Sequence, residues 1–161
     1  MELYLVQHGE AKAETEDPER PLTEHGQETV RKMGAWAAQV GMRVDQIRHS
    51  GKRRAEQTAA LLAERLSPAQ GVVAVGGLKP NDDPRPLAES LQAESEPLML
   101  VGHLPFLSRL ASLLVSGNPE GNVIRFRQAG IVCLSQDQDK WSVNWVMPPE
   151  LLGASKATGG E

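Results

Sequence analysis

Short apolar runs alternate with amphipathic stretches along this 161-residue chain, and that alternation limits the fold more than any other feature. A short apolar run is typical of a buried strand, whereas apolar residues that recur every three or four positions indicate a helix. The runs lie in the segments Leu3–Val6, Val44–Ser50, Val72–Val75 and Leu98–Val101. We therefore expect an α/β fold, a three-layer sandwich whose mixed, mostly parallel sheet carries helices on both faces.

Helix boundaries can be predicted from capping residues and prolines. Thr23 is a candidate N-cap for a helix that ends near Gln39, and a second helix is expected from about residue 52 to 66. Asp83 and Pro105 mark the starts of two further helices, Asp83 as an N-cap and Pro105 as a residue of the first turn. The predicted helices fall between the apolar runs, as an α/β fold requires.

Three more strands are predicted after the last of these helices, in the segments Val123–Phe126, Gly130–Leu134 and Trp141–Val146. The last two are expected to pair in antiparallel fashion across a polar turn. Apolar residues alternate along the final segment, which is typical of a half-buried strand. Residues 1–150 are expected to form one domain, and residues 151–161, most of them small or polar, a disordered tail.

Charge and composition exclude several classes of partner. The net charge is −4 and the isoelectric point is near 5.6, so the chain has no basic surface for nucleic acid. No segment resembles a signal peptide or is apolar enough to span a membrane, so we expect a cytoplasmic protein without a membrane partner. The single cysteine, Cys133, lies in an apolar run and is expected to be a buried, unreactive thiol.

Three of the predicted strands end in polar residues next to glycine. These ends are Gln7-His8-Gly9, His49-Ser50-Gly51 and Gly102-His103. The carboxyl ends of parallel strands meet at one edge of a sheet, which is where ligands bind in open α/β folds. Helices follow two of the ends, and a helix N-terminus offers free N–H groups and a partial positive charge to an anion. This edge is therefore predicted to bind an anion.

The residues at this edge suit phosphoryl transfer to an imidazole nucleophile. A neutral His8 can attack phosphorus while Arg54 and His103 stabilise the charge on the phosphoryl oxygens. The candidate phosphate-binding residues are Gln7, Gly9, Ser50, Arg54 and His103. Each has a plainer explanation when taken alone, because a histidine at a strand end is usually a packed polar group and a serine before a helix is usually a cap. The agreement of three strand ends favours the phosphate site.

Four stretches also occur in the order typical of one family, namely Leu3–Ala11, Arg20–Gly26, Ser50–Thr58 and Leu100–Pro105. By these the chain resembles the histidine phosphatase superfamily, and within it the small bacterial phosphohistidine phosphatases of the SixA type, over about residues 1–148. The resemblance implies a phosphoglycerate mutase-like fold and a histidine phosphatase domain. It also implies that His8 is the phosphorylated nucleophile, with Arg54 and His103 as further catalytic residues.

The chain departs from the family pattern in two places. The family has an arginine immediately before the nucleophile, whereas this chain has Gln7, whose amide carries no charge. Loss of one such donor can cost about 10²–10³ in rate, unless Arg20 or Lys12 in the next loop supplies a replacement cation. The glutamate general acid of the mutases and many metabolite phosphatases is also missing. Asp82 or Asp83 could serve instead, although Asp83 is better explained as a helix cap.

The expected function is hydrolysis of phosphohistidine in a protein through a covalent intermediate on His8, because an imidazole leaves more easily than an alkoxide. One alternative is a small-metabolite phosphomonoesterase of the same superfamily. The other is a non-catalytic phosphate-binding module, because Gln7 replaces the arginine of the family. A mutase is disfavoured because the segment that would hold its acid is short. No metal or organic cofactor is expected. The expected partners are phosphate and a phosphorylated protein, such as a histidine phosphorelay protein in bacterial-type signalling.

Overall fold

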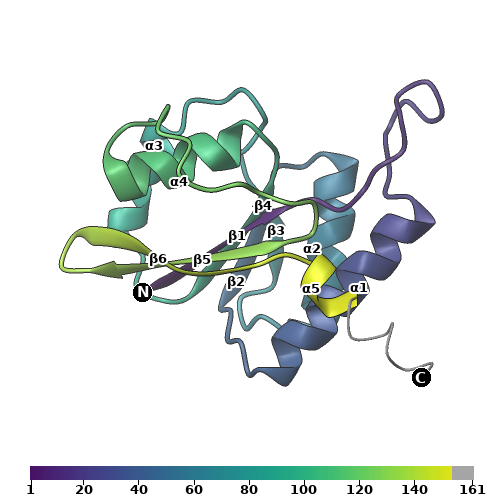
Figure 1. Cartoon of the computed structure of the whole chain (residues 1–161), viewed down its shortest axis with the longest axis horizontal. Coiled ribbons are helices and arrows are strands. Elements are labelled where there is room, and N and C mark those ends of the chain that lie inside the picture. Colours follow the sequence, from purple (N-terminus) through teal and green to yellow (C-terminus); the bar gives the residue numbers. More distant parts are fainter. Residues whose placement is uncertain (154–161) are drawn as a thin grey trace.

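One mixed sheet forms the centre of the computed structural model, which describes residues 1–153 (Figure 1). The strand order is β3-β2-β4-β1-β5-β6. The strands are β1 (Glu2–Gln7), β2 (Gln46–His49), β3 (Val72–Ala74), β4 (Leu98–Gly102), β5 (Ile131–Asp137) and β6 (Lys140–Met147). The first four run parallel to one another, β5 is antiparallel to β1, and β6 is antiparallel to β5. The predicted mixed, mostly parallel sheet is confirmed.

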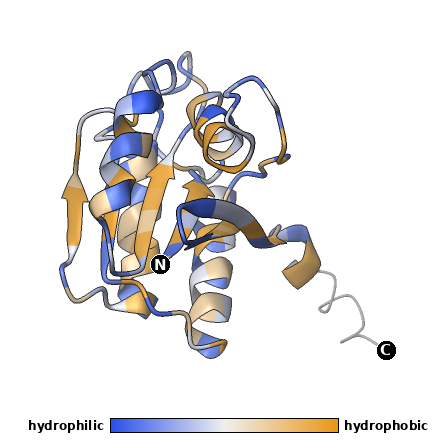
Figure 2. Cartoon of the chain, turned by 90° about the vertical axis from the view of Figure 1, so that its left-hand side faces the viewer, coloured by the Kyte–Doolittle hydropathy of each residue, from blue (hydrophilic) through white to orange (hydrophobic). Residues whose placement is uncertain are grey.

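Helices cover both faces of the sheet and complete the predicted three layers. The helices are α1 (Glu24–Gln39), α2 (Arg53–Leu66), α3 (Arg85–Ser90), the short 3₁₀ helix η1 (Leu91–Ala93), α4 (Phe106–Ser116) and α5 (Glu150–Gly153). Side chains of β1 alternate between two cores. Tyr4 and Val6 pack with α1 and α2, whereas Leu3 and Leu5 pack with α4. Figure 2 shows the apolar strands between helices that are hydrophobic on one side only.

The helix ends follow the predicted caps closely. Thr23 accepts a hydrogen bond from the backbone N–H of Gly26 at 2.9 Å, and α1 ends at Gln39 as expected. Pro105 precedes the first residue of α4. Asp83 accepts from the N–H of Arg85 at 3.1 Å, although α3 begins one residue later than Pro84. A side-chain cap is thus present at the start of α1, whereas the N-cap of α3 is Pro84 and not Asp83.

The predicted strand at Val123–Phe126 is wrong. Ile124 and Phe126 are buried, so the alternation of apolar residues is real, but the segment pairs with no strand. The reason is that β5 already occupies the edge of β1 that this segment would need. Its Val123 N–H donates instead to Ser112 Oγ at 3.1 Å. An isolated bridge between Gln7 and Gln128, two residues further along, joins the chain to the end of β1.

The C-terminal hairpin forms as predicted, but with an irregularity. Gln138 and Asp139 both have positive φ in the turn between β5 and β6. The register shifts between Cys133 and Leu134, which sends Trp145 to the α1 side of the sheet and Trp141 to the α4 side. Cys133 is buried as expected, and burial raises the pKa of its thiol to about 11.

The end of the described chain is partly helical. Residues 150–153 form α5, so the first residues of the segment predicted to be a disordered tail are ordered here. The rest of that segment, residues 154–161, lies outside the described residues. Within residues 1–153, every helix is too short or too polar to cross a membrane.

Candidate active site

The three predicted strand ends meet at one edge of the sheet. β4 lies between β1 and β2, so the residues that follow these strands are neighbours in space. His8, Ser50 and His103 are all buried there. The ring centroids of the two histidines are 5.1 Å apart. The prediction that residues ninety-five positions apart converge is thereby confirmed in its geometry.

His8 is held as a neutral ring with one free nitrogen. Its Nδ1 lies 2.7 Å from the carbonyl oxygen of Gly9. Because a carbonyl only accepts hydrogen bonds, Nδ1 must carry the proton, and Nε2 of the neutral ring then has a lone pair. Burial lowers the pKa of His8 to about 4, against the smaller raising effect of the hydrogen bond to Gly9. A neutral imidazole with an available Nε2 is the form that can act as a nucleophile.

Arg54 lies against that free nitrogen. It is the second residue of α2, and its Nε donates to His8 Nε2 at 3.3 Å. Partial burial lowers the pKa of the guanidinium, but an arginine stays charged in proteins. The guanidinium fork can bind two phosphoryl oxygens at once. An anion that displaces this contact would therefore sit between the nucleophile and a cation.

Ser50 and His103 form a buried pair whose hydrogen bonds define the state of the second ring. The Ser50 hydroxyl lies 2.7 Å from His103 Nε2, and Ser50 Oγ also accepts from the N–H of Lys52 at 3.3 Å. When the hydroxyl donates to Nε2, the proton of the neutral ring is on Nδ1. Burial lowers the pKa of His103 to about 3, so the ring is neutral.

The Nδ1 atom of His103 is buried without a hydrogen-bond partner among the described residues. Buried polar atoms are nearly always paired, so an unpaired buried nitrogen next to the nucleophile points to a partner that only a ligand would supply. In the tautomer given above, this atom is an N–H donor. It is therefore available to an oxygen of a bound phosphoryl group.

Side chains of helix α2 hold two loops next to the site through hydrogen bonds. Thr58 Oγ1 accepts the N–H of Gly9 at 3.0 Å and donates to the carbonyl of Arg54 at 2.8 Å. Gln57 Oε1 accepts the N–H of Leu22 at 2.7 Å. The expectation that Gly9 binds phosphate fails for its backbone N–H, which is already used. Sequence reasoning missed Thr58, although its spacing of four residues from Arg54 places both on one helix face.

Gly9 and Gly26 are glycines because two backbones approach closely. A Cβ on Gly9 would lie 2.8 Å from Val30 Cγ2, and a Cβ on Gly26 would clash with the carbonyl oxygen of Glu10. Neither glycine has a positive φ, so the requirement is space and not backbone conformation. The first turns of α1 thus pack directly on the loop that follows the nucleophile.

A basic hollow of about 620 Å³ lies on the α2 side of the site. Its cations are Arg20, Lys52, Arg53 and Arg54, and its carboxylates are Glu14, Glu19 and Glu56. Arg20 has a positive φ of 51° and its Nε donates to the carbonyl of Lys12 at 3.0 Å. Its charge contributes to the lowered pKa values of His8 and Arg54, which reflects its proximity. The structure thus brings Arg20, but not the Lys12 side chain, to the hollow.

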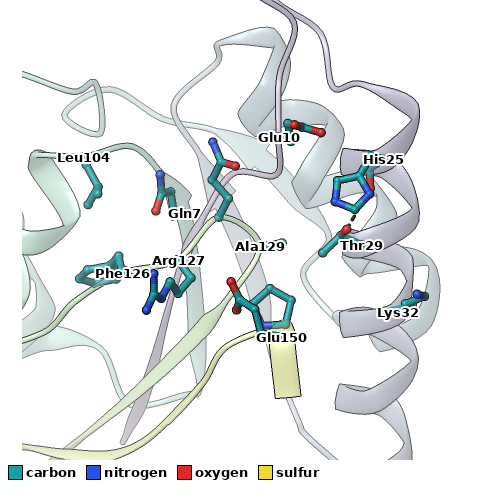
Figure 3. Close-up of a pocket in the computed structure, with 12 residues that line it drawn as sticks. Gln7, Glu10, His25, Thr29, Lys32, Leu104, Phe126, Arg127, Ala129 and Glu150 are labelled. Atoms are coloured by element: carbon teal, nitrogen blue, oxygen red, sulfur yellow. Dashed lines mark hydrogen bonds between the residues drawn. The ribbon is translucent and has the colours of Figure 1, made fainter. Parts of the chain in front are cut away.

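A second pocket, of about 600 Å³, lies on the other side of Gln7 (Figure 3). Leu104, which follows His103, also lines it, so the pocket adjoins both histidines through their chain neighbours. The remaining residues of its wall are Glu10, His25, Thr29, Lys32, Phe126, Arg127, Gln128, Ala129, Pro149 and Glu150. Figure 3 shows Gln7 and Arg127 on the side of the sheet, facing His25 and Lys32 of α1.

The two aspartates considered as general acids serve the local backbone instead. Asp82 accepts from the N–H of Lys79 at 2.9 Å, and Asp83 caps Arg85 and pairs with its guanidinium at 3.4 Å. Both hydrogen bonds are at the surface. Neither aspartate is therefore positioned as an acid for the site. In residues 1–153, no three His, Cys, Asp or Glu side chains gather as a metal site would require.

Comparison with known proteins agrees with this geometry. The model of the histidine phosphatase superfamily (branch 1) matches residues 3–79. An uncharacterised protein of Picosynechococcus sp. is 33% identical over 142 residues, which cover 83% of this chain and 84% of that protein. The phosphohistidine phosphatase SixA of Escherichia coli is 26% identical over 163 residues, which cover 98% and 99%. The chain belongs to the histidine phosphatase superfamily.

Solved structures show how widely this histidine phosphatase fold is shared. The protein histidine phosphatase SixA in complex with tungstate has a TM-score of 0.84 and 25% identity, over 94% of this chain and 99% of that one. The α-ribazole phosphatase of Shigella flexneri has a TM-score of 0.74 and 16% identity, over 92% and 97%, a likeness of fold alone. The chain is thus a phosphatase of this superfamily, but proteins named for different substrates have the same architecture.

Proposed function

We propose that this histidine phosphatase hydrolyses phosphohistidine on a protein. The observation that carries the proposal is the engagement of Asp82 and Asp83 in surface hydrogen bonds with the backbone N–H groups of Lys79 and Arg85. A phosphomonoester releases an alkoxide, which needs a proton from an acid, whereas phosphohistidine releases an imidazole, a far better leaving group. The SixA relatives, which match along nearly their whole length, support the same substrate class.

In the proposed mechanism, the P–N bond of the substrate is exchanged for a P–N bond to His8. The lone pair on Nε2 attacks phosphorus, and the substrate imidazole leaves and takes a proton from solvent. Arg54 turns from Nε2 to the phosphoryl oxygens, and the Nδ1–H of His103 donates to another oxygen. Water then attacks the phosphorylated His8, which releases inorganic phosphate and restores the neutral ring.

The cations of the basic hollow help to bind the substrate before the phosphoryl group is transferred. Arg20 and Lys52 lie beside Arg54 in this open hollow, where they attract a doubly charged phosphoryl group. Arg20 is our candidate residue on the substrate side. An open, basic entrance fits a phosphorylated side chain carried by a folded protein, such as a cytoplasmic histidine phosphorelay protein.

The test is to incubate the chain with a protein that carries ³²P-phosphohistidine and to map the label. We expect acid-labile phosphate on the peptide that contains His8 and release of inorganic phosphate. The His8→Ala variant should show neither. The Arg43→Ala variant, which loses an exposed cation paired with Glu96, should behave as the native chain does. Undiminished hydrolysis by His8→Ala would contradict the mechanism.

A small phosphomonoester is the second candidate substrate, and the pocket beside Gln7 favours it. A volume of about 600 Å³ is within the usual range for small-ligand sites. The α-ribazole phosphatase has a similar fold. A comparison of kcat/KM for sugar phosphates and for a phosphohistidine protein distinguishes the candidates. A higher value for any sugar phosphate would favour the metabolite.

A further inference from the structure

Gln7 lacks the charge that its position has in the family, but another guanidinium lies close by. Arg127 lines the same pocket as Gln7, and Figure 3 shows both on the side of the sheet. Arg127 is exposed, so its side chain is free to turn toward a ligand. It belongs to the irregular segment that was expected to be a strand.

The backbone holds Arg127 in a fixed place relative to Gln7. The N–H of Ala129 donates to the carbonyl of Gln7 at 2.8 Å, and Gln7 and Gln128 form a parallel bridge. The N–H of Gly130 closes the turn on the carbonyl of Arg127 at 2.9 Å. Arg127 is therefore one residue from a direct attachment to the strand that carries the nucleophile. These hydrogen bonds fix the backbone of Arg127, and the exposed guanidinium turns toward the ligand from there.

The charge of Arg127 is not committed to another group within residues 1–153. None of the ion pairs or side-chain hydrogen bonds there involves its guanidinium. Glu10 and Glu150 line the same pocket, but neither is paired with it. Arg20, by contrast, lies in the hollow on the α2 side and has its Nε bound to Lys12. The two arginines thus approach the site from different sides.

We infer that Arg127 binds the phosphoryl group of the substrate from the side of Gln7, in place of the arginine that the family has at position 7. The inference rests on the proposed function for the identity of the substrate. A guanidinium supplies two parallel donors to phosphate oxygens, which the amide of Gln7 cannot. Gln7 is shorter than arginine, and both Gln7 and Arg127 line the same pocket.

A double-mutant cycle on positions 7 and 127 tests the inference. The readout is the Kd for tungstate by calorimetry, together with kcat/KM for a phosphohistidine protein. We expect Arg127→Ala to weaken tungstate binding by about 10- to 100-fold, the usual loss for one charge-assisted hydrogen-bonded pair. Gln7→Arg should restore binding in the Arg127→Ala background and change it little in the native background.

Two control variants test whether a loss of tungstate binding comes from the guanidinium of Arg127 itself. Arg125→Ala removes an exposed arginine from the same segment that does not line the pocket, and it should bind tungstate as the native chain does. Arg127→Gln keeps a polar side chain without the charge and should behave as Arg127→Ala. Equal gains from Gln7→Arg in both backgrounds, or native affinity in Arg127→Ala, would overturn the inference. So would a native chain that does not bind tungstate.

The cycle also separates this inference from the proposed function. Tungstate is a tetrahedral anion like phosphate and needs no phosphohistidine. If the two positions are coupled in tungstate binding but phosphohistidine is not hydrolysed, then the substrate is wrong and Arg127 is right. If phosphohistidine is hydrolysed and the positions are not coupled, the opposite holds.

Discussion

The hydroxyl of Ser50 lies 2.7 Å from Nε2 of His103, which joins the ends of β2 and β4. The direction of this hydrogen bond and the tautomer of the buried, neutral ring depend on each other. With Nε2 as acceptor, Nδ1 becomes a donor that no described residue uses. With the opposite tautomer, Nδ1 would present a lone pair and would repel a phosphoryl oxygen. A serine that could be taken for a helix cap therefore sets the chemistry of a histidine.

Replacement of Ser50 by alanine should disturb that tautomer. We expect kcat/KM to fall by about fivefold, because one hydrogen bond of about 1 kcal/mol no longer favours the Nδ1–H form. The ¹⁵N chemical shifts of the His103 ring should move from the pattern of one tautomer toward a mixture. Ser108→Ala, at a serine bonded to Asn122, is the control. An unchanged ring spectrum in Ser50→Ala would contradict this role.

Thr58 should matter for stability through its hydroxyl. Thr58→Val keeps the shape of the side chain but leaves the buried N–H of Gly9 without its acceptor. We expect the free energy of unfolding to drop by about 1–3 kcal/mol. Thr58→Ser, which keeps the hydroxyl, should lose much less. Urea denaturation of both variants checks this, and equal stabilities would show that the hydroxyl is dispensable.

The two buried glycines of α1 should respond to alanine with opposite signs. Gly26→Ala forces a methyl group against the backbone of Glu10, and such overpacking costs about 1–3 kcal/mol. Gly34→Ala has room, since the nearest atom, Cγ of Arg65, is 3.5 Å away. Alanine in a helix interior is favoured over glycine by about 0.5–1 kcal/mol. Thermal unfolding should therefore place the native chain between the two variants.

The stability of the fold should fall as the pH drops below about 6.5. The folded state lowers the pKa of His8 to about 4 and of His103 to about 3, whereas an unfolded histidine titrates near 6.5. Between these values the unfolded chain binds more protons, so acid favours unfolding. From pH 7 to pH 5, each ring should account for roughly 2 kcal/mol of lost stability.

Urea denaturation at the two pH values checks this loss. The variant with both His8→Gln and His103→Gln should lose less stability on acidification than the native chain. His25→Gln, at an exposed ring on α1, should lose as much as the native chain. An identical loss in the double variant would mean that the carboxylates alone account for the acid sensitivity.

Much of the architecture could be predicted because local and global signals agree. The apolar runs, the Thr23 cap and the proline before α4 all coincide with real boundaries. The convergence of His8, Ser50 and His103 also followed from a general property of parallel sheets. These residues are placed by the backbone at strand ends, so a pattern in one dimension was enough.

Other features depend on which edges and faces are already taken. Val123–Phe126 has a strand-like sequence, but β5 occupies the position it would need. The bulge near Cys133 moves Trp141 and Trp145 to opposite faces, which alternation in sequence does not reveal. Sequence reasoning also missed Arg127, because a residue in an irregular segment has no periodicity that would place it near Gln7.

Helix α2 has a consequence for how this protein could be changed. It contributes Arg54 and also anchors the loop after the nucleophile through Thr58 and the Leu22 loop through Gln57. Helix α2 thus holds one catalytic side chain and two loops together, whereas the nucleophile and His103 follow strands β1 and β4, and the 121–130 segment and α5 form part of the pocket wall. Substitutions in α5, or in the 121–130 segment at positions other than Arg127, should therefore reshape the pocket wall and leave the contacts made by α2 in place.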